Sequence, residues 1–204
     1  MKPARIKVIT IFSYLNDIHI NKDPLLYPIT FKKMGMESIF ITSDNQLTKK
    51  RNIPRIIVLR NRQPKSVLRG IRSYLNYMVE ELKYGKEISD IVKNEKPNIV
   101  IYYRDPISAF IVKLFNPNVN IVWKVEYGGE IEDLPFPKFI VNLSFMFKYL
   151  ISSVLITESA DSYGRLIKFA PYLKGKMKLI PNGIPKNFTL FFILSAFAKT
   201  ISPL

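Results

Sequence analysis

Short apolar runs rich in β-branched residues recur along the chain, and segments with helical spacing separate them. Runs of this kind are typical of strands that are covered on both faces of a sheet. Because the strands alternate with helices, the pattern predicts an α/β fold: a Rossmann-like, doubly wound parallel sheet with helices on both faces. The predicted strands are residues 6–12, 38–42, 55–59, 98–103, 120–125, 154–157 and 177–180.

Two of the intervening segments begin with the signals of a helix start. Asp23 precedes Pro24, and Asp105 precedes Pro106, so each pair places a capping side chain before a residue suited to the first helical position. For Asp105, side-chain capping is sufficient to explain the residue type. Further helices are expected at residues 138–151 and 159–169.

The longest helical pattern extends from residue 66 to about residue 93, where apolar side chains recur every three or four positions. Gly85 lies inside this segment, and glycine disfavours a helix interior. The pattern therefore predicts either one long helix or two helices that join at Gly85.

The chain is strongly basic, and much of the excess charge lies in one segment. Lys and Arg total 31 against 16 Asp and Glu in 204 residues, a formal net charge of +15, and no acidic residue lies between Asp44 and Glu80. An anionic partner is expected: a membrane lipid, a phosphate-bearing substrate or nucleic acid. Nucleic acid is less favoured, because only Tyr74 and Tyr77 lie near the basic run. The predicted anion-binding side chains are Lys49, Lys50, Arg51, Arg62, Lys65, Arg69 and Arg72.

The sequence also excludes several classes of protein. It has no cysteine, so it has no disulfide framework, and no metal site is expected. It has neither a P-loop nor a dinucleotide-binding fingerprint. No apolar run reaches the ~20 residues of a membrane-spanning helix, which predicts a cytoplasmic protein, either free or held on the inner face of a membrane. The helix at 138–151 is apolar around most of its circumference and is either a mostly buried core helix or a membrane-docking one.

Residues that directly follow the predicted strands form the candidate site, because ligands of open α/β sheets bind outside the carboxyl ends of the strands. An arginine there can pair with a phosphate, and a carboxylate can orient a sugar hydroxyl. Ser159 has an alternative role as a helix cap, and Gly128 as a turn residue. The candidate substrate-binding residues are Arg104, Glu126, Tyr127, Gly128, Glu158 and Ser159.

Residues 154–184, VLITESADSYGRLIKFAPYLKGKMKLIPNGI, combine a strand, a serine, a helix, a second strand and a Pro-Asn-Gly turn. This order resembles the end of the N-terminal domain of the family-four, retaining GT-B glycosyltransferases, and the resemblance extends over residues 1–186. It implies that this segment is the acceptor-side half of a two-domain enzyme whose other half binds a nucleotide-sugar co-substrate. It also implies an interdomain hinge at Pro181, Asn182 and Gly183, and it implies no other cofactor.

Two functions stay open on the sequence alone. Residues 187–204 form an apolar tail, which we interpret as the start of a missing C-terminal donor domain. The chain is then a glycosyltransferase, or a truncated fragment of one, that acts on a lipid- or glycan-linked acceptor and relies on a missing or separate donor half. The alternative is a non-catalytic, basic Rossmann-like domain that binds an anionic membrane lipid or nucleic acid.

Overall fold

The strands form one sheet in a computed structural model that describes residues 6–12, 23–43, 55–59, 70–103, 105–125 and 138–180. The strand order of this seven-stranded sheet is β3-β2-β1-β4-β5-β6-β7, which confirms the predicted Rossmann-like α/β fold. Each predicted strand is present, with small shifts at its ends. The strands are β1 (Lys7–Ile11), β2 (Glu37–Thr42), β3 (Arg55–Val58), β4 (Ile99–Tyr102), β5 (Asn120–Lys124), β6 (Val154–Thr157) and β7 (Met177–Leu179).

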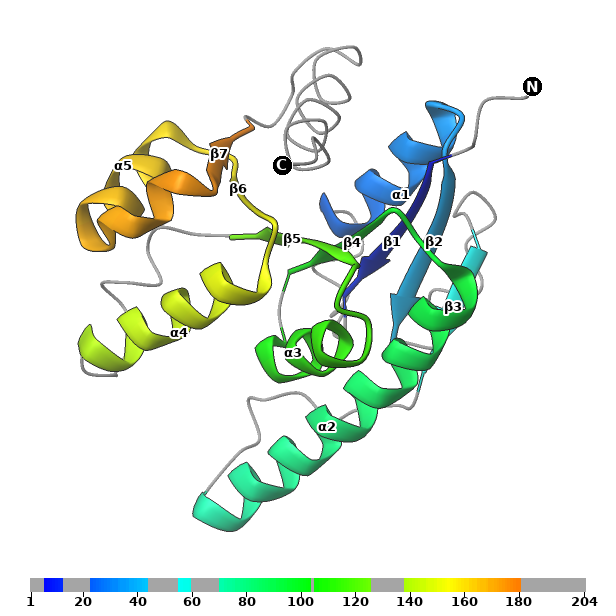
Figure 1. Ribbon diagram of the computed structural model, residues 1–204, viewed down its shortest axis with the longest axis horizontal. Helices are drawn as coiled ribbons and strands as arrows, with labels where there is room; N and C mark the ends of the chain where they lie inside the picture. The colour runs from blue at the N-terminus through cyan, green and yellow to red at the C-terminus, as the bar shows by residue number, and fades with distance from the viewer. Residues whose placement is uncertain are drawn as a thin grey trace. The chain divides into compact units, whose positions relative to one another are not determined.

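Helices connect most of these strands, as the alternating pattern predicts (Figure 1). A short 3₁₀ helix, η5 (Pro171–Gly175), precedes the last strand. The α-helices are α1 (Asp23–Lys33), α2 (Gly70–Glu95), α3 (Pro106–Phe115), α4 (Lys138–Ile151) and α5 (Ala160–Phe169). The described part of the chain contains no helix with the length and apolar character needed to cross a bilayer.

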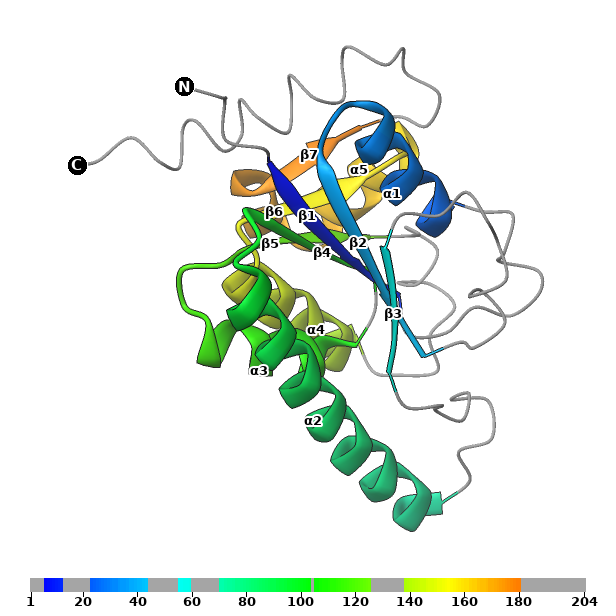
Figure 2. The same ribbon diagram turned by 90° about the vertical axis from the view of Figure 1, so that its right-hand side faces the viewer.

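The chain divides into two compact units, Met1–Val122 and Trp123–Leu204. In the first unit β1 lies between β2 and β4 and is parallel to both, with Val8 opposite Ser38 on one side and Ile99 on the other. Helix α1 lies on one face of these strands, and α2 and α3 lie side by side on the other (Figures 1 and 2). β4 is buried at all of its positions, and β1 and β2 are buried at all but the first, whereas β3 at the edge of the sheet is partly exposed.

Helix α2 continues through Gly85 without a break, so the alternative of two joined helices is wrong. The glycine is explained by close packing against α3. A Cβ atom at position 85 would lie 2.9 Å from the Ile111 Cβ and 2.9 Å from the Ser108 Cα. The close approach of two helix backbones therefore requires glycine here, and tertiary packing outweighs its poor helix propensity.

Charged side chains join the amino ends of three strands in the first unit. The Lys7 ammonium lies 3.2 Å from the Glu37 carboxylate and 3.0 Å from Glu95, and Arg55 lies 2.7 Å from Glu95. Lys7, Glu37 and Arg55 are the first residues of β1, β2 and β3, and Glu95 is the last residue of α2. The network thus fixes the end of α2 against the start of the sheet.

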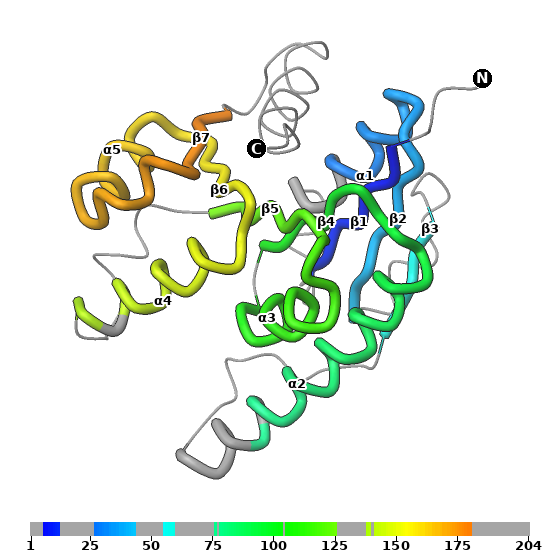
Figure 3. The backbone as a smooth tube through the Cα atoms, in the orientation of Figure 1, coloured from blue at the N-terminus to red at the C-terminus, as the bar shows by residue number. Residues whose placement is uncertain are grey.

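The second unit contains α4, β6, α5, η5 and β7, whose path is traced in Figure 3. β6 and β7 pair in parallel, and the Val125 N–H donates to the Ile156 carbonyl at 2.8 Å, which connects β5 to β6. Helix α4 buries Val141, Phe145 and Ile151. The sequence allowed α4 to be either a mostly buried core helix or a membrane-docking helix. Burial alone does not decide between them, because one face of α4 is buried and the opposite face is exposed.

Candidate functional site

The carboxyl ends of the strands carry the candidate site, but only some of its predicted residues can be placed. Glu158 and Ser159 follow β6 within the described residues. The remaining substrate-binding candidates, Arg104, Glu126, Tyr127 and Gly128, lie outside the described residues, as does the predicted hinge at Pro181, Asn182 and Gly183. Of the basic surface, Arg72 belongs to α2, and Lys49, Lys50, Arg51, Arg62, Lys65 and Arg69 are also outside that part of the chain.

A buried ion pair lies at the carboxyl edge of the second unit. Lys124 is the last residue of β5, and its ammonium contacts the carboxylate of Glu158, directly after β6. The Lys124 side chain is 3% exposed and that of Glu158 is 16% exposed. A lysine buried to this degree is costly unless it has an ionic partner. Lys124 therefore holds the Glu158 carboxylate in place while leaving it within reach of solvent.

Lys124 was not among the predicted site residues. Its signal in the sequence is a charged residue inside the otherwise apolar run NIVWKV. A lysine that ends a buried strand needs an anion at the same edge of the sheet, and Glu158 occupies the equivalent place after the neighbouring strand. The arrangement suits hydrogen bonding to hydroxyl groups, since an ionised carboxylate accepts several hydrogen bonds.

Ser159 caps helix α5. Its backbone is extended, with φ −120° and ψ 136°, and the Ser162 N–H donates to its Oγ at 3.2 Å. The capping alternative is therefore confirmed. The side chain is also exposed, which leaves it accessible to a ligand, and its predicted role in substrate binding stays a prediction.

Asp105 does not cap helix α3 as predicted. It occupies the position before the helix, but its side chain makes no capping hydrogen bond. The residue has left-handed backbone angles, φ 65° and ψ 64°, and it is 1% exposed. A capping residue normally has extended backbone angles, which Asp105 does not have, and this is why the local Asp-Pro signal was misleading. Left-handed backbone at a non-glycine residue stores ~1 kcal/mol or more of strain.

Polar side chains from three elements surround the end of β4 in the interior of the first unit. The Tyr102 hydroxyl lies 3.3 Å from the Ser108 Oγ. Burial raises the pKa of the Tyr102 phenol well above its usual value, and the nearby Tyr84, Asp105 and Glu81 raise it further. Tyr102 therefore stays neutral across the physiological range, and this interior cluster orders the exit from β4.

An aromatic cluster lies where β1 and β4 end. Phe12 follows β1 and Tyr103 follows β4, and their rings meet edge to face with centroids 5.4 Å apart. Tyr27 of α1 contacts Tyr103 with a centroid distance of 6.1 Å. The sheet continues to β2 on one side of β1 and to β4 on the other, and such switch points bind ligands in open α/β sheets. The rings of Phe12 and Tyr103 are buried and form the protein surface beneath this switch point. The sequence signal for this cluster is an aromatic residue directly after each of the two apolar runs.

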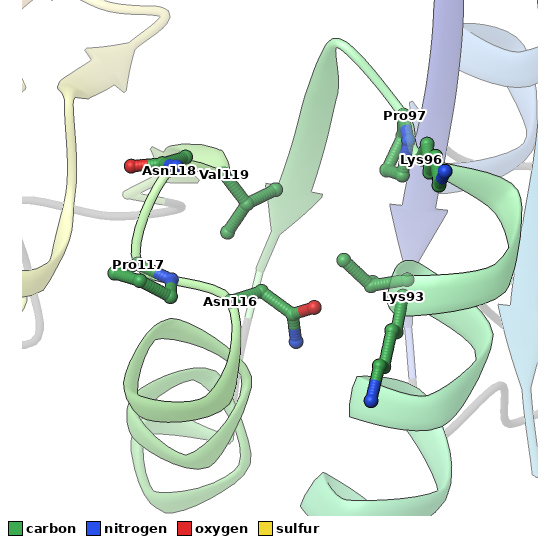
Figure 4. Close-up of a pocket in the computed structure, with 8 residues that line it drawn as sticks. Lys93, Lys96, Pro97, Asn116, Pro117, Asn118 and Val119 are labelled. Atoms are coloured by element: carbon green, nitrogen blue, oxygen red, sulfur yellow. The ribbon is translucent and has the colours of Figure 1, made fainter.

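A hollow of about 400 Å³ lies at the opposite, amino end of the strands in the first unit (Figure 4). It lies between the end of α2, with Lys93 and Lys96, and the end of α3, with Asn116. The Asn116 amide donates to the Ser89 Oγ at 2.9 Å and so joins the two helices. The hollow adjoins the starts of β4 and β5, whereas ligands of this fold class bind at the strand ends. It is therefore not the predicted substrate site.

In the described ranges, no three His, Cys, Asp or Glu side chains come close enough together to hold a metal ion. The chemistry that the described site residues offer is thus that of one positioned carboxylate, one buried ammonium and one serine hydroxyl.

The sheet order and helix arrangement are those of one Rossmann-like half of a GT-B fold. No family model matches the chain, and no curated protein shows significant similarity to it. Solved structures do share the fold. A glycosyltransferase from Rickettsia africae ESF-5 is 17% identical with a TM-score of 0.60, and the match covers 98% of this chain and 51% of that one.

Two further structures widen the comparison. A sucrose-phosphate synthase from Thermosynechococcus elongatus is 11% identical with a TM-score of 0.59, covering 88% of this chain and 49% of the other. A UDP-GlcNAc 2-epimerase from Neisseria meningitidis, bound to UDP-GlcNAc, is 12% identical with a TM-score of 0.51, covering 85% and 45%. The chain thus spans about half the length of these three proteins.

Proposed function

We propose that this chain is the acceptor-side half of a retaining, family-four GT-B glycosyltransferase that transfers a sugar from a nucleotide-sugar to a lipid- or polymer-linked acceptor. The observation that carries the proposal is the order β6, Glu158, Ser159, α5, β7, which matches the strand, serine, helix and strand of the family pattern. The segment that follows β7 in the sequence is Ile-Pro-Asn-Gly-Ile, as in the family.

The reaction class rests on this sequence pattern, because the fold is shared by transferases and by a nucleotide-sugar epimerase. These relatives supply the expectation of a nucleotide-sugar ligand, since one of them was solved with UDP-GlcNAc. In a GT-B enzyme the donor is bound by a second Rossmann-like half, and the proposal requires such a half.

In this proposal Glu158 orients an acceptor hydroxyl, and Lys124 positions Glu158. The buried ammonium holds the carboxylate in one place, so that it accepts a hydrogen bond from the hydroxyl that will be glycosylated. Ligand binding by Arg104 and Glu126 stays a prediction from their positions directly after apolar runs in the sequence.

Calorimetry with a panel of nucleotide-sugars tests the proposal. The chain alone and the chain joined to a donor-binding half are compared, and binding by the joined form alone is expected. Absence of binding by both forms contradicts the proposal. It favours the basic binding domain instead, which the net charge of +15 supports and which vesicle and nucleic-acid binding assays would then identify.

Glu158→Asp in the joined form tests the site itself. The shorter side chain keeps the charge near Lys124 but withdraws the carboxylate from the acceptor, so we expect sugar transfer to fall about tenfold or more. Asp161→Asn is the matched control, because Asp161 is an exposed carboxylate on α5 that pairs with Arg165 at 3.0 Å. Equal activity of both variants would contradict a role for Glu158.

A further inference from the structure

Helix α4 has a second apolar face that the second unit does not cover. Val141, Phe145 and Ile151 face the core, at 4%, 2% and 6% exposure. The opposite side of the helix carries four large apolar side chains, which we call the outer stripe: Phe139 at 65%, Leu143 at 52%, Met146 at 43% and Leu150 at 65% exposure. Their spacing of four, three and four residues places them in one line along the helix.

The polar residues of α4 do not interrupt this line. Lys148 turns inward, with its ammonium 5.5 Å from the centroid of the Trp123 ring and 4.9 Å from that of Phe145. Asn142, at the side of the stripe, accepts a hydrogen bond from the Tyr172 hydroxyl at 2.7 Å. A continuous exposed apolar stripe of this kind marks an interaction site.

The surroundings of the outer stripe are basic and aromatic. Residues 138–180 contain seven Lys and Arg but only two acidic residues, Glu158 and Asp161. Next to α4, η5 exposes Lys174, and Tyr172 packs edge to face on Tyr149 with centroids 5.7 Å apart. Tyrosines that have an apolar body and a hydroxyl tip are enriched at the level of lipid headgroups.

We propose that the outer stripe docks on the surface of an anionic phospholipid bilayer, with α4 parallel to the membrane plane. The apolar side chains enter the boundary between headgroups and acyl chains, and the flanking lysines contact lipid phosphates. The charge favours this occupant over a second copy of the chain, because two molecules with a formal charge of +15 repel each other. The inference does not depend on sugar transfer.

Vesicle co-sedimentation of the full chain tests this surface. Vesicles of phosphatidylcholine alone are compared with vesicles that also contain phosphatidylglycerol, and binding is expected only to the anionic vesicles and is expected to weaken with added salt. Leu143→Asp is expected to reduce the binding about tenfold or more, because a charge replaces an inserted leucine. Leu114→Asp on α3 is the matched control, since Leu114 is 58% exposed on a helix of the other unit, and it should bind like the wild type.

Trp123 is the only tryptophan and is buried behind α4, so its unchanged fluorescence would show that Leu143→Asp remains folded. Equal binding by the wild type and the folded Leu143→Asp variant would overturn the proposal, as would equal binding to neutral vesicles. A wild-type dimer that Leu143→Asp converts to a monomer would also overturn it and would make a second copy the occupant. Failure of nucleotide-sugar binding leaves this result unaffected, so the two proposals fail separately.

Discussion

The two units place their ion pairs at opposite ends of their own strands. In the first unit Lys7, Glu37 and Arg55 begin their strands and meet Glu95. The side chains of Glu37 and Arg55 are 45% and 58% exposed, and those of Lys7 and Glu95 are 21% and 17% exposed. In the second unit Lys124 ends its strand and meets Glu158 where both are largely buried. The chemistry of the two groups is the same, but their surroundings differ.

This difference separates partly exposed charges at the strand starts from a buried pair at the strand ends. Exposed pairs contribute little to stability and are easily accommodated at a strand start. A buried pair is often no better for stability than apolar residues of the same volume. Lys124 and Glu158 lie at the edge where this fold class binds ligands, so the proposed site depends on them.

The largest effect is expected from Glu158→Gln. Removal of the carboxylate leaves the Lys124 ammonium, 3% exposed, without this partner, and we expect a loss of about 3 kcal/mol in the free energy of unfolding. Urea unfolding followed by Trp123 fluorescence measures it. Lys124→Met combined with Glu158→Leu is expected to recover most of the loss. A loss below that of Glu95→Gln would contradict the contrast between the two units.

Gly85→Ala is expected to cost about 2 kcal/mol, because the added methyl group meets Ile111 and Ser108 at 2.9 Å and forces α2 away from α3. The matched control is Gly164→Ala in α5, where no atom lies within 4 Å of the added Cβ. That variant should gain about 0.5–1 kcal/mol from helix propensity. Thermal unfolding of both proteins gives the comparison, and a stabilised Gly85→Ala variant would disprove the close-packing explanation.

Ser159→Ala is expected to cost about 1 kcal/mol through the loss of the α5 cap. Ser159→Asn retains a capping oxygen and should restore most of this stability. Chemical denaturation therefore measures the capping role. If the stable Ser159→Asn variant, joined to a donor-binding half, still loses sugar-transfer activity, Ser159 has a separate role in ligand binding.

Glu95→Gln should have the smallest effect, below about 1 kcal/mol. The hydrogen bond from Lys7 lowers the pKa of Glu95, and the charge of Arg55 lowers it further. A carboxyl group with a lowered pKa contributes stability above its unfolded value, near 4.5, and loses that contribution as the pH falls through the folded value. The wild type and the variant should therefore differ in stability at neutral pH and converge in acid, as unfolding at a series of pH values would show.

The same reasoning applies with the opposite sign to Lys7, whose pKa is raised mainly by its hydrogen bond with Glu95. This contribution is complete below the ordinary lysine value of 10.5 and disappears as the pH rises through the raised value. A stability difference between wild type and Glu95→Gln that stayed constant from acid to alkaline pH would contradict the ionic nature of the network.

The strands were predictable from the sequence because buried parallel strands are continuous apolar runs, and such runs are local signals. The sequence left one or two helices open at Gly85, and it was wrong about Asp105. In both places the local rule was outweighed by a contact or a backbone conformation that only the folded unit supplies. In α4 the apolar residues surround the helix, so spacing alone did not distinguish the core face from the outer stripe.

The candidate site was predictable only in part. Glu158 and Ser159 were predicted because they directly follow a strand, and the structure confirms that position and the capping role of Ser159. Their role in ligand binding stays a prediction. Lys124 was missed because its partner lies far along the chain, and pairing between neighbouring strands leaves no trace in the local pattern. The aromatic contact between Phe12 and Tyr103 depends in the same way on β1 and β4 being neighbours.

The pairing of β1 with β4 affects the order in which the chain can fold while it is being synthesised. β1 is made first, yet one of its two sides is completed only by β4, and the Lys7 N–H reaches Asn98, 91 residues later. Contacts of such long sequence separation form slowly, because the intervening chain must first be ordered. While the ribosome adds α2, β1 has an open edge, and the basic segment before α2 emerges during this interval. β1 therefore keeps one edge unpaired until β4 has been made, and an unpaired strand edge makes a nascent chain prone to aggregation.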